Sequence, residues 1–132
     1  MNTFEAQILT PEGTVFDGDV TGIKVPGIEG SFEVKVNHAP IISTLDIGKV
    51  RVRHTDNPDE FFAVSGGFLE LNNNKLTLLA EAAECSEDID VDRARKAKER
   101  AQKRLENPGD EASRYQARQA LRRAKNRLDV AK

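Results

Sequence analysis

Several residue types on which large cores, disulfides and metal sites depend are scarce in this chain. Its 132 residues contain no Trp, two His and one Cys, and only 5% are aromatic. A single cysteine excludes an internal disulfide and agrees with a reducing compartment, and we interpret Cys85 as a small, half-buried residue. His38, His54 and Cys85 lie in separate segments without the spacing of metal ligands. The sequence therefore predicts a modest core and no metal site.

Long apolar runs and catalytic constellations are also lacking. No apolar run approaches the length of a membrane span, and residues 1–5 lack a basic leader followed by an apolar stretch. We therefore expect a chain that is soluble, is not exported and does not insert into a membrane. The pair Gly66-Gly67 is not followed by the Lys and Ser or Thr of a phosphate-binding loop, and a positive φ in a hairpin or bulge explains it more simply. No nucleophile, base and oxyanion hole come together, so we predict no catalytic residues and no enzyme activity of the isolated chain.

The spacing of apolar residues divides the chain into two domains. Apolar residues alternate with polar ones before Glu84, and they recur every third or fourth residue after Asp90. This change of period predicts a β domain over residues 1–86 and a helical domain over residues 87–132. Short apolar segments at intervals of about 8 to 12 residues predict an antiparallel sandwich or flattened barrel. The expected breaks between strands lie at 10–13, 18–19, 26–30, 37–40, 54–59, 65–67 and 72–74.

The helical domain is predicted to be two antiparallel helices joined by a break at 107–110. Asp90 and Asp92 suit the first turn of the first helix, where carboxylates accept free backbone N–H groups. The apolar stripes are mostly alanine, and each buried methyl contributes only about 0.8 kcal/mol, against an ordering cost of about 1 kcal/mol or more per residue. We therefore expect a marginal hairpin that folds back, extends or docks according to its surroundings. The apolar positions are Val91, Ala94, Ala97, Ala101, Leu105, Ala117, Ala120, Leu121, Ala124, Leu128 and Ala131.

The two halves of the chain carry opposite charge. Residues 1–87 contain 6 Lys and Arg against 14 Asp and Glu, a net charge of −8, whereas residues 88–132 contain 14 against 8, a net charge of +6. This asymmetry indicates that the basic half meets something acidic, its own other half included.

Four arginines of the helical domain are candidates for anion binding. Arg93 and Arg100 are seven residues apart and share one helix face, and Arg123 and Arg127, four apart, share another. Guanidinium groups suit phosphate oxygens, although basic residues that simply solvate a helix face show the same spacing. Nucleic acid is another possible polyanion. Tyr115 is the one aromatic residue in this half, so base stacking has little support and we expect no nucleic-acid partner.

Two acidic residues at the base of the hairpin complete the candidate ligand set. Glu84 and Asp90 are placed to accept hydrogen bonds from an amino-bearing ring such as adenine. His38 has no neighbouring group that would make it a general base, so we assign it to loop structure or to a partner surface.

Several segments along the chain are characteristic of one family: 8–13, 37–41, 64–70, 79–84, the Asp-x-x-Arg-Ala motif within 89–94 and the Arg-Ala-x-Asn-Arg-Leu motif at 123–128. Through them the sequence resembles the epsilon subunit of bacterial F-type ATP synthase over essentially its whole length. The resemblance implies a β-sandwich of about ten antiparallel strands followed by an α-helical hairpin.

The same resemblance implies a function and a set of partners. In that family a non-catalytic subunit sits on the central stalk of a proton-translocating enzyme, at the cytoplasmic face of the cell membrane, as a peripheral protein. Its sandwich binds the gamma subunit and the ring of c subunits. Its hairpin lies folded or rises toward the alpha and beta subunits, where it inhibits ATP hydrolysis. The alternative is a free-standing module that binds anions or nucleic acid through the basic half.

Individual site residues also follow from the resemblance. In some family members ATP binds the folded hairpin as a regulatory ligand, and no other cofactor is implied. Many members have Gly-Glu-Leu-Gly before the loop of His38, whereas this chain has Ser31 and Glu33 at the second and fourth positions. We therefore expect partner contacts at Ser31 and His38, with Glu29 substituting for the missing carboxylate. The positions that match the ATP site are Glu84, Ile89, Asp90, Arg93, Ala94, Arg100, Arg123 and Arg127.

Overall fold

The structure, a computed structural model, describes residues 2–107 and 109–131. The strands are β1 (Phe4–Thr10), β2 (Gly13–Val20), β3 (Gly22–Gly27), β4 (Gly30–Lys35), β5 (Ile41–Arg53), β6 (Glu60–Asn72), β7 (Lys75–Ala80) and β8 (Ala83–Cys85). A short 3₁₀ turn, Ser86–Asp88, leads into the helices α1 (Val91–Glu106) and α2 (Glu111–Val130).

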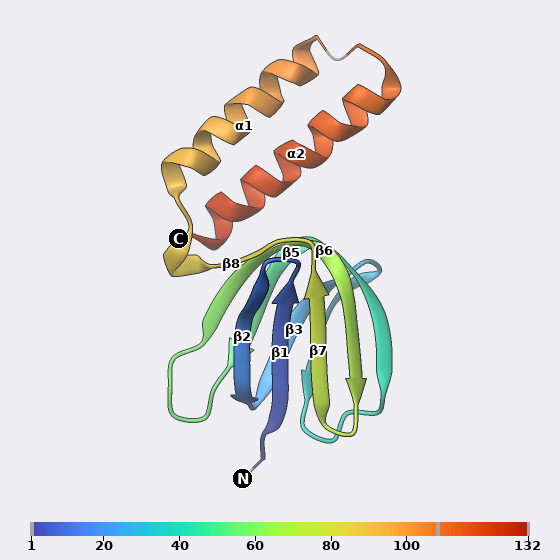
Figure 1. The fold of residues 1–132 in the computed structure, drawn as a ribbon, viewed down its shortest axis with the longest axis vertical. Helices are drawn as coiled ribbons and strands as arrows, with labels where there is room; N and C mark the ends of the chain where they lie inside the picture. The colour runs from blue at the N-terminus through green and yellow to red at the C-terminus, as the bar shows by residue number, and fades with distance from the viewer. Residues whose placement is uncertain (1, 108, 132) are drawn as a thin grey trace.

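The strands form one continuous sheet that wraps into two layers. Their order is β2-β1-β7-β6-β5-β3-β4, and β8 pairs with β6. Figure 1 shows β5 and β6 passing over the end of the sandwich beneath the hairpin, so that each contributes to both layers. The amino terminus lies at the opposite end of the sandwich, and the carboxyl terminus lies at the foot of the hairpin (Figure 1). The predicted fold class, a β-sandwich followed by a helical hairpin, is confirmed.

The strand count differs from the expected ten. Within the described residues there are eight strands, and β6 continues across residues 65–67, where a break was expected. Gly18 and Asp19 likewise lie inside β2, and the short strand β8 was not predicted. One pairing is also parallel instead of antiparallel, since β1 lies beside β7 in the same direction. A sequence pattern shows which residues alternate, but not which strands become neighbours.

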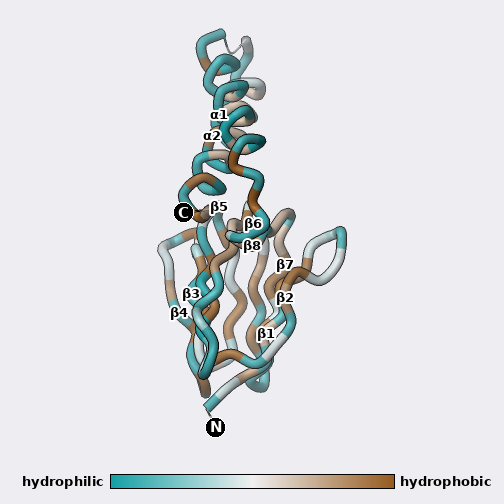
Figure 2. Tube along the Cα trace, turned by 90° about the vertical axis from the view of Figure 1, so that its left-hand side faces the viewer, coloured by the Kyte–Doolittle hydropathy of each residue, from teal (hydrophilic) through white to brown (hydrophobic). Residues whose placement is uncertain are grey.

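The alternating apolar residues form the core between the two layers. The largest fully buried side chains include Phe62, Ile8, Ile23, Leu69 and Leu76. Figure 2 shows the hydrophobic residues concentrated in the strands and the helices largely hydrophilic. Most of the buried apolar surface therefore belongs to the sandwich, and the hydrophobic effect stabilises this domain more than the hairpin.

Each helix begins at an aspartate. Asp90 Oδ1 accepts a hydrogen bond from the backbone N–H of Arg93 at 3.1 Å, and Asp110 Oδ1 accepts one from that of Ser113 at 2.8 Å. The first of these N-caps was predicted. Both bonds satisfy backbone donors that a helix start leaves free. The predicted break at 107–110 falls between the helices, and its Pro108 lies outside the described residues.

The seam of the hairpin is as thin as expected. Its buried side chains are Ala94, Ala101, Ala117 and Ala124. A second small cluster, of Ala63, Ile89 and Val130 with Phe61 and Ala131 at its edge, joins the foot of the hairpin to the sandwich. The hairpin therefore depends on contacts with the sandwich at its foot for much of its order.

Gly67 offers a direct test of the bend in β6. Its φ is +147°, and a Cβ there would lie 2.0 Å from the carbonyl oxygen of Leu79 on β7. We expect Gly67→Ala to destabilise the sandwich by more than about 3 kcal/mol, because backbone strain adds to a clash with backbone. Urea denaturation monitored by circular dichroism measures this.

Gly13→Ala is the matched control for this prediction. Gly13 also has a positive φ, +132°, but a Cβ there meets nothing within 4 Å. Its substitution should therefore show the strain alone, of about 1 kcal/mol. Equal losses of stability in the two variants would contradict the close approach at Gly67.

Candidate functional site

Most of the predicted nucleotide-binding residues meet in a cleft at the foot of the hairpin. The cleft has a volume of about 530 Å³ and lies between β8, the start of α1, the end of α2 and the turn between β1 and β2. The predicted residues in its lining are Glu84, Asp90, Arg93, Ala94 and Arg127. Arg127 thus reaches residues at the start of α1, more than thirty positions earlier in the chain, because α1 and α2 are antiparallel.

A smaller hollow of about 270 Å³ adjoins this cleft. Glu84 and Arg127 line both spaces, and Arg123 and Asn126 add to the second. Arg123 and Arg127 are one helical turn apart, so their guanidinium groups lie on one face of α2. The two spaces together hold three arginines beside acidic groups.

Two predicted residues are not in these linings. Ile89 is buried below the cleft, where it packs against Ala63 and Val130. Arg100 is exposed on α1 and lies about 10 Å further along the helix than Arg93, because seven residues each rise 1.5 Å. The structure therefore places Arg100 in the lining of neither space.

The cleft contains carboxylates that the sequence analysis did not assign to it. Glu12, from the turn between β1 and β2, and Asp88, from the 3₁₀ turn, line it together with Glu84 and Asp90. Arg127 Nη1 lies 3.8 Å from Glu84 Oε1, so one arginine is already paired with an acidic group. Glu12 was missed because its turn is distant in sequence and reaches the helices only through the folding of the sandwich.

The chemistry of the cleft suits a ligand with an anionic and an amino-bearing end. Arg93, Arg123 and Arg127 offer guanidinium donors to phosphate oxygens. Glu84 offers acceptors to an amino group, while Asp90 is engaged as the N-cap of α1. The arrangement therefore permits binding, and it contains no evident nucleophile with a base.

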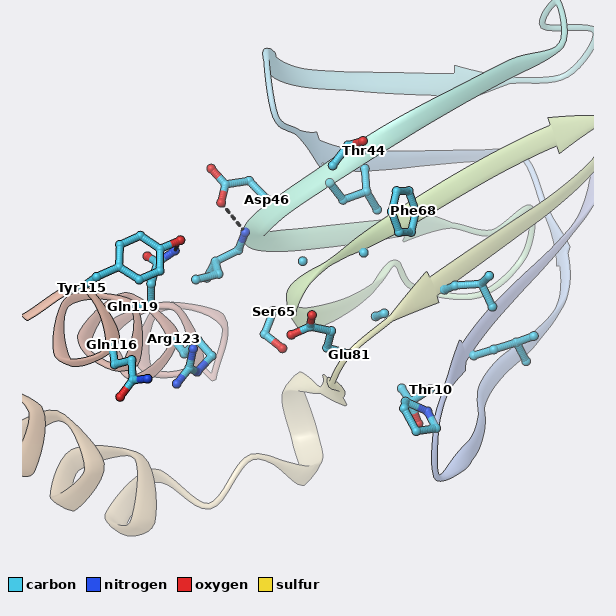
Figure 3. A pocket seen from close by; sticks show the side chains of 18 residues that line it. Thr10, Thr44, Asp46, Ser65, Phe68, Glu81, Tyr115, Gln116, Gln119 and Arg123 are labelled. Atoms are coloured by element: carbon cyan, nitrogen blue, oxygen red, sulfur yellow. Dashed lines mark hydrogen bonds between the residues drawn. The ribbon is translucent and has the colours of Figure 1, made fainter. Parts of the chain in front are cut away.

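A second and larger space lies between the sandwich and the middle of α2. This groove, of about 800 Å³, has Leu45, Phe68 and Leu79 on the sandwich side. Figure 3 shows Tyr115, Gln116, Gln119 and Arg123 of α2 facing it from the other side. An apolar floor with a polar wall is the usual character of a binding groove between two domains.

The floor of the groove continues into an apolar band on the outside of the sheet. Ile28, Ile42, Phe68 and Leu79 are exposed to 63%, 77%, 58% and 52%. Phe68 lies opposite Leu79 on β7, and Leu79 lies beside Leu9 on β1. Such a contiguous exposed apolar surface indicates a protein interface. It was missed in the sequence because outward-facing apolar residues show the same alternation as a core strand.

The predicted partner residues Glu29, Ser31 and His38 lie along the sheet edge formed by β4. Ser31 faces Pro26 near the turn that contains Glu29, whereas His38 follows the far end of the strand, where its N–H donates to Lys35 O at 3.2 Å. A strand of six residues spans about 20 Å, so the structure does not bring the three side chains together. All three are exposed.

The middle of this edge is held by an ion pair. Arg53 Nε donates to Glu33 Oε2 at 2.5 Å, and the bond holds the pKa of the Glu33 carboxyl below its ordinary value. Glu33, a position at which the sequence departs from the related family, thus ties β4 to β5.

Comparison with known proteins identifies the family. Residues 3–86 match the family model for the beta-sandwich domain of the ATP synthase delta/epsilon chain, and residues 87–132 match the model for its long alpha-helix domain. The ATP synthase epsilon chain of Halalkalibacterium halodurans is 46% identical over 132 residues, covering 99% of this chain and 98% of the relative. The chain belongs to the ATP synthase epsilon family.

Other relatives agree with this membership. The ATP synthase epsilon chain of Caldicellulosiruptor bescii is 45% identical and covers 99% of this epsilon chain. A chain in the cryo-EM structure of the Euglena gracilis mitochondrial ATP synthase, described as OSCP/F1/c-ring, superposes with a TM-score of 0.84 at 24% identity, covering 99% of this chain and 82% of that one. At that identity the likeness shows a shared fold.

Family membership settles the class of the protein. As an epsilon chain it is a subunit of the ATP synthase complex and not one of its catalytic chains. Neither helix in the part of the chain that the structure describes has the length and apolar character needed to cross a membrane.

Proposed function

We propose that this epsilon chain is a central-stalk subunit of a proton-translocating F-type ATP synthase. It couples rotation of the c-ring to ATP synthesis and restrains ATP hydrolysis through its mobile hairpin. It acts as a peripheral subunit at the cytoplasmic face of the cell membrane. The observation that carries the proposal is a weakly packed, basic hairpin folded onto a sandwich that leaves an apolar band uncovered.

The apolar band is the proposed docking surface for the gamma subunit. Four large apolar side chains, three on neighbouring strands and Ile28 in the turn between β3 and β4, are costly to leave in water. The family-related function also requires a stable contact with the stalk. The groove beside the band brings α2 to the same side of the sandwich (Figure 3). A gamma subunit on the band therefore also contacts the folded hairpin, and it is placed to respond to hairpin movement.

The raised hairpin is proposed to meet the alpha and beta subunits. The helical half of the chain carries a charge of +6, so acidic segments of the catalytic head attract it. Docking there replaces the few contacts at the hairpin foot with new contacts to the catalytic head. Little free energy is lost in this exchange, because the alanine seam buries little apolar surface.

The third proposed partner is the c-ring, along the β4 edge. Glu29, Ser31 and His38 are too far apart for one compact ligand, but a broad, flat partner laid along β4 contacts both ends of the strand. The polar loops of a ring provide such a surface.

ATP is the proposed regulatory ligand of the cleft at the hairpin foot. Its phosphates interact with Arg93, Arg123 and Arg127, and its adenine amino group donates to Glu84. Because these residues come from β8, α1 and α2, a bound nucleotide connects the hairpin to the sandwich. It therefore stabilises the folded hairpin and opposes inhibition.

Substitution in the apolar band tests the docking of gamma. Phe68→Glu places a charge in the centre of the proposed interface. We expect the affinity for gamma to fall at least about 30-fold, which is the usual effect of losing a buried hot-spot residue. Suppression of ATP hydrolysis in the reconstituted complex should be lost with it. Surface plasmon resonance and an ATPase assay measure the two effects.

Thr55→Glu adds the same charge in the exposed loop between β5 and β6 and serves as the control. It should leave gamma binding unchanged. A wild-type chain that neither binds gamma nor suppresses hydrolysis would overturn the proposed function itself.

Charge reversal at the β4 edge tests the ring contact. We expect Glu29→Lys to reduce ATP-driven proton pumping by a few-fold, because a carboxylate that faces the ring becomes a cation, while gamma binding stays normal. Fluorescence quenching in inverted vesicles reports the pumping. Asp56→Lys, an exposed reversal in another loop, is the control, and unchanged coupling in Glu29→Lys would count against the contact.

A titration with ATP, with and without Mg²⁺, tests the cleft. We expect saturable heat in wild type, and a loss of affinity of tenfold or more in Asp90→Ala and Arg127→Ala, because each removes a group at the site. Isothermal titration calorimetry on the full chain measures the binding.

The chain provides matched controls for this titration. Asp110→Ala also removes an N-cap but lies outside the cleft, and Arg118→Ala also removes an arginine of α2. Both should bind ATP as wild type does. If the wild-type chain does not bind ATP in the millimolar range, the residues of the cleft have only capping and packing roles.

A further inference from the structure

The foot of α2 presents two adjacent stripes of polar side chains to the sandwich. Arg127 lines the proposed nucleotide cleft and the adjoining small hollow, and Arg123 lines the hollow. Arg122 and Asn126, each one position earlier, are also one helical turn apart, and their side chains contact the bend of β5. Asn126 also lines the small hollow, whereas Arg122 lines neither of the two spaces.

Asn126 donates to backbone that a neighbouring strand leaves free. Its Nδ2 lies 2.8 Å from the carbonyl oxygen of Gly48 on β5 and 3.5 Å from that of Val64 on β6. At this place β3 carries Pro26, which packs closely against Gly48, and proline has no N–H to donate. The register of β3 and β5 also shifts between Lys24 and Gly27. The amide of Asn126 therefore donates to the carbonyl of Gly48 at a place where the nearby Pro26 has no N–H to offer.

Arg122 forms an ion pair with the same bend. Its Nη2 lies 3.1 Å from Asp46 Oδ2. The other carboxylate oxygen of Asp46 accepts a hydrogen bond from the backbone N–H of Ile47 at 2.8 Å, which fixes the carboxylate on the turn. The bond from Arg122 holds the pKa of Asp46 below its ordinary value, so the pair is charged at neutral pH.

We propose that Asn126 and Arg122, bound to Gly48 and Asp46, form a latch that holds the hairpin folded without any ligand. Both are positioning residues: they hold α2 so that Arg127 lies at the cleft and Arg123 at the adjoining hollow before a nucleotide binds. The seam and the small apolar cluster at the foot bury few large side chains. Directed polar contacts therefore contribute much of the preference for this position of α2 on the sandwich. The hairpin is released only when both contacts break.

The size of the effect follows from the type of contact. A hydrogen bond between an amide and a partly buried carbonyl shifts an equilibrium by about five- to tenfold, and an ion pair half exposed to water shifts it by less. Loss of Asn126 should therefore raise the ratio of lifted to folded hairpin about fivefold or more, and loss of Arg122 about twofold.

A distance measurement on the full chain tests the latch in the absence of nucleotide. Spin labels at Glu70→Cys on β6 and Lys103→Cys on α1, in a Cys85→Ser background, report the hairpin position by double electron–electron resonance. We expect Asn126→Asp and Arg122→Ala to increase the long-distance population. The double variant Asp46→Arg with Arg122→Asp reverses the pair and should restore the wild-type distribution.

Two controls match these substitutions. Asn107→Asp makes the same chemical change at the far end of α1, and Arg118→Ala removes an arginine one turn before Arg122. Neither should move the distribution. Unchanged distances in both Asn126→Asp and Arg122→Ala would overturn the latch.

A second readout rests on the proposed nucleotide binding. If ATP binds only the folded hairpin, its apparent affinity falls with the folded fraction. Arg122→Ala, which changes a residue outside both spaces of the nucleotide site, should therefore weaken ATP binding by the factor by which its folded fraction falls. A shift of the labels without ATP binding to any variant would support the latch and overturn the nucleotide proposal. Full ATP affinity in a variant whose hairpin is mostly lifted would overturn the role of the latch in seating the arginines.

Discussion

The bend of β5 and β6 is the constraint on which the rest of the structure depends. At this bend both strands pass from one layer of the sandwich to the other, and Gly67 permits the passage because a side chain there would meet the backbone of β7. The same bend exposes the carbonyl of Gly48 and presents the carboxylate of Asp46 to α2. The core closes on one side of it and the hairpin sits on the other, so the covalent geometry of a few residues sets the relation between the two domains.

The two domains are stabilised by different means. The sandwich has a continuous apolar core, whereas the helices share an alanine seam and reach the sandwich through a small cluster and a few polar contacts. Each of those polar contacts contributes little to stability, so only a small free energy holds the hairpin on the sandwich. A difference of that size is within the reach of a bound ligand or a partner subunit. The weak packing is therefore compatible with regulation in a way that a large apolar interface would not be.

The sequence predicted those features that depend on local pattern. The alternation, the N-cap at Asp90 and the alanine stripes gave the fold class and the hairpin, and their reading agrees with the structure. It could not predict that β1 and β7 are parallel, that Glu12 reaches the cleft, or that Arg100 stays apart. These depend on which strands become neighbours and on the direction of the helix axes. The same limit applies to Asn126, whose partner Gly48 is distant in sequence and offers only a backbone oxygen.

The parallel pairing of β1 with β7 has a consequence for synthesis of the chain. Glu5 lies beside Lys75 and Leu9 beside Leu79. During synthesis β1 therefore cannot pair with β7 until almost the whole sandwich domain has been made. Until then its apolar side chains have only β2 as a hydrogen-bonded neighbour, and contacts so distant in sequence form slowly. The first strand therefore keeps one unpaired edge until β7 has been made, and the helices are made only after the surface on which they rest.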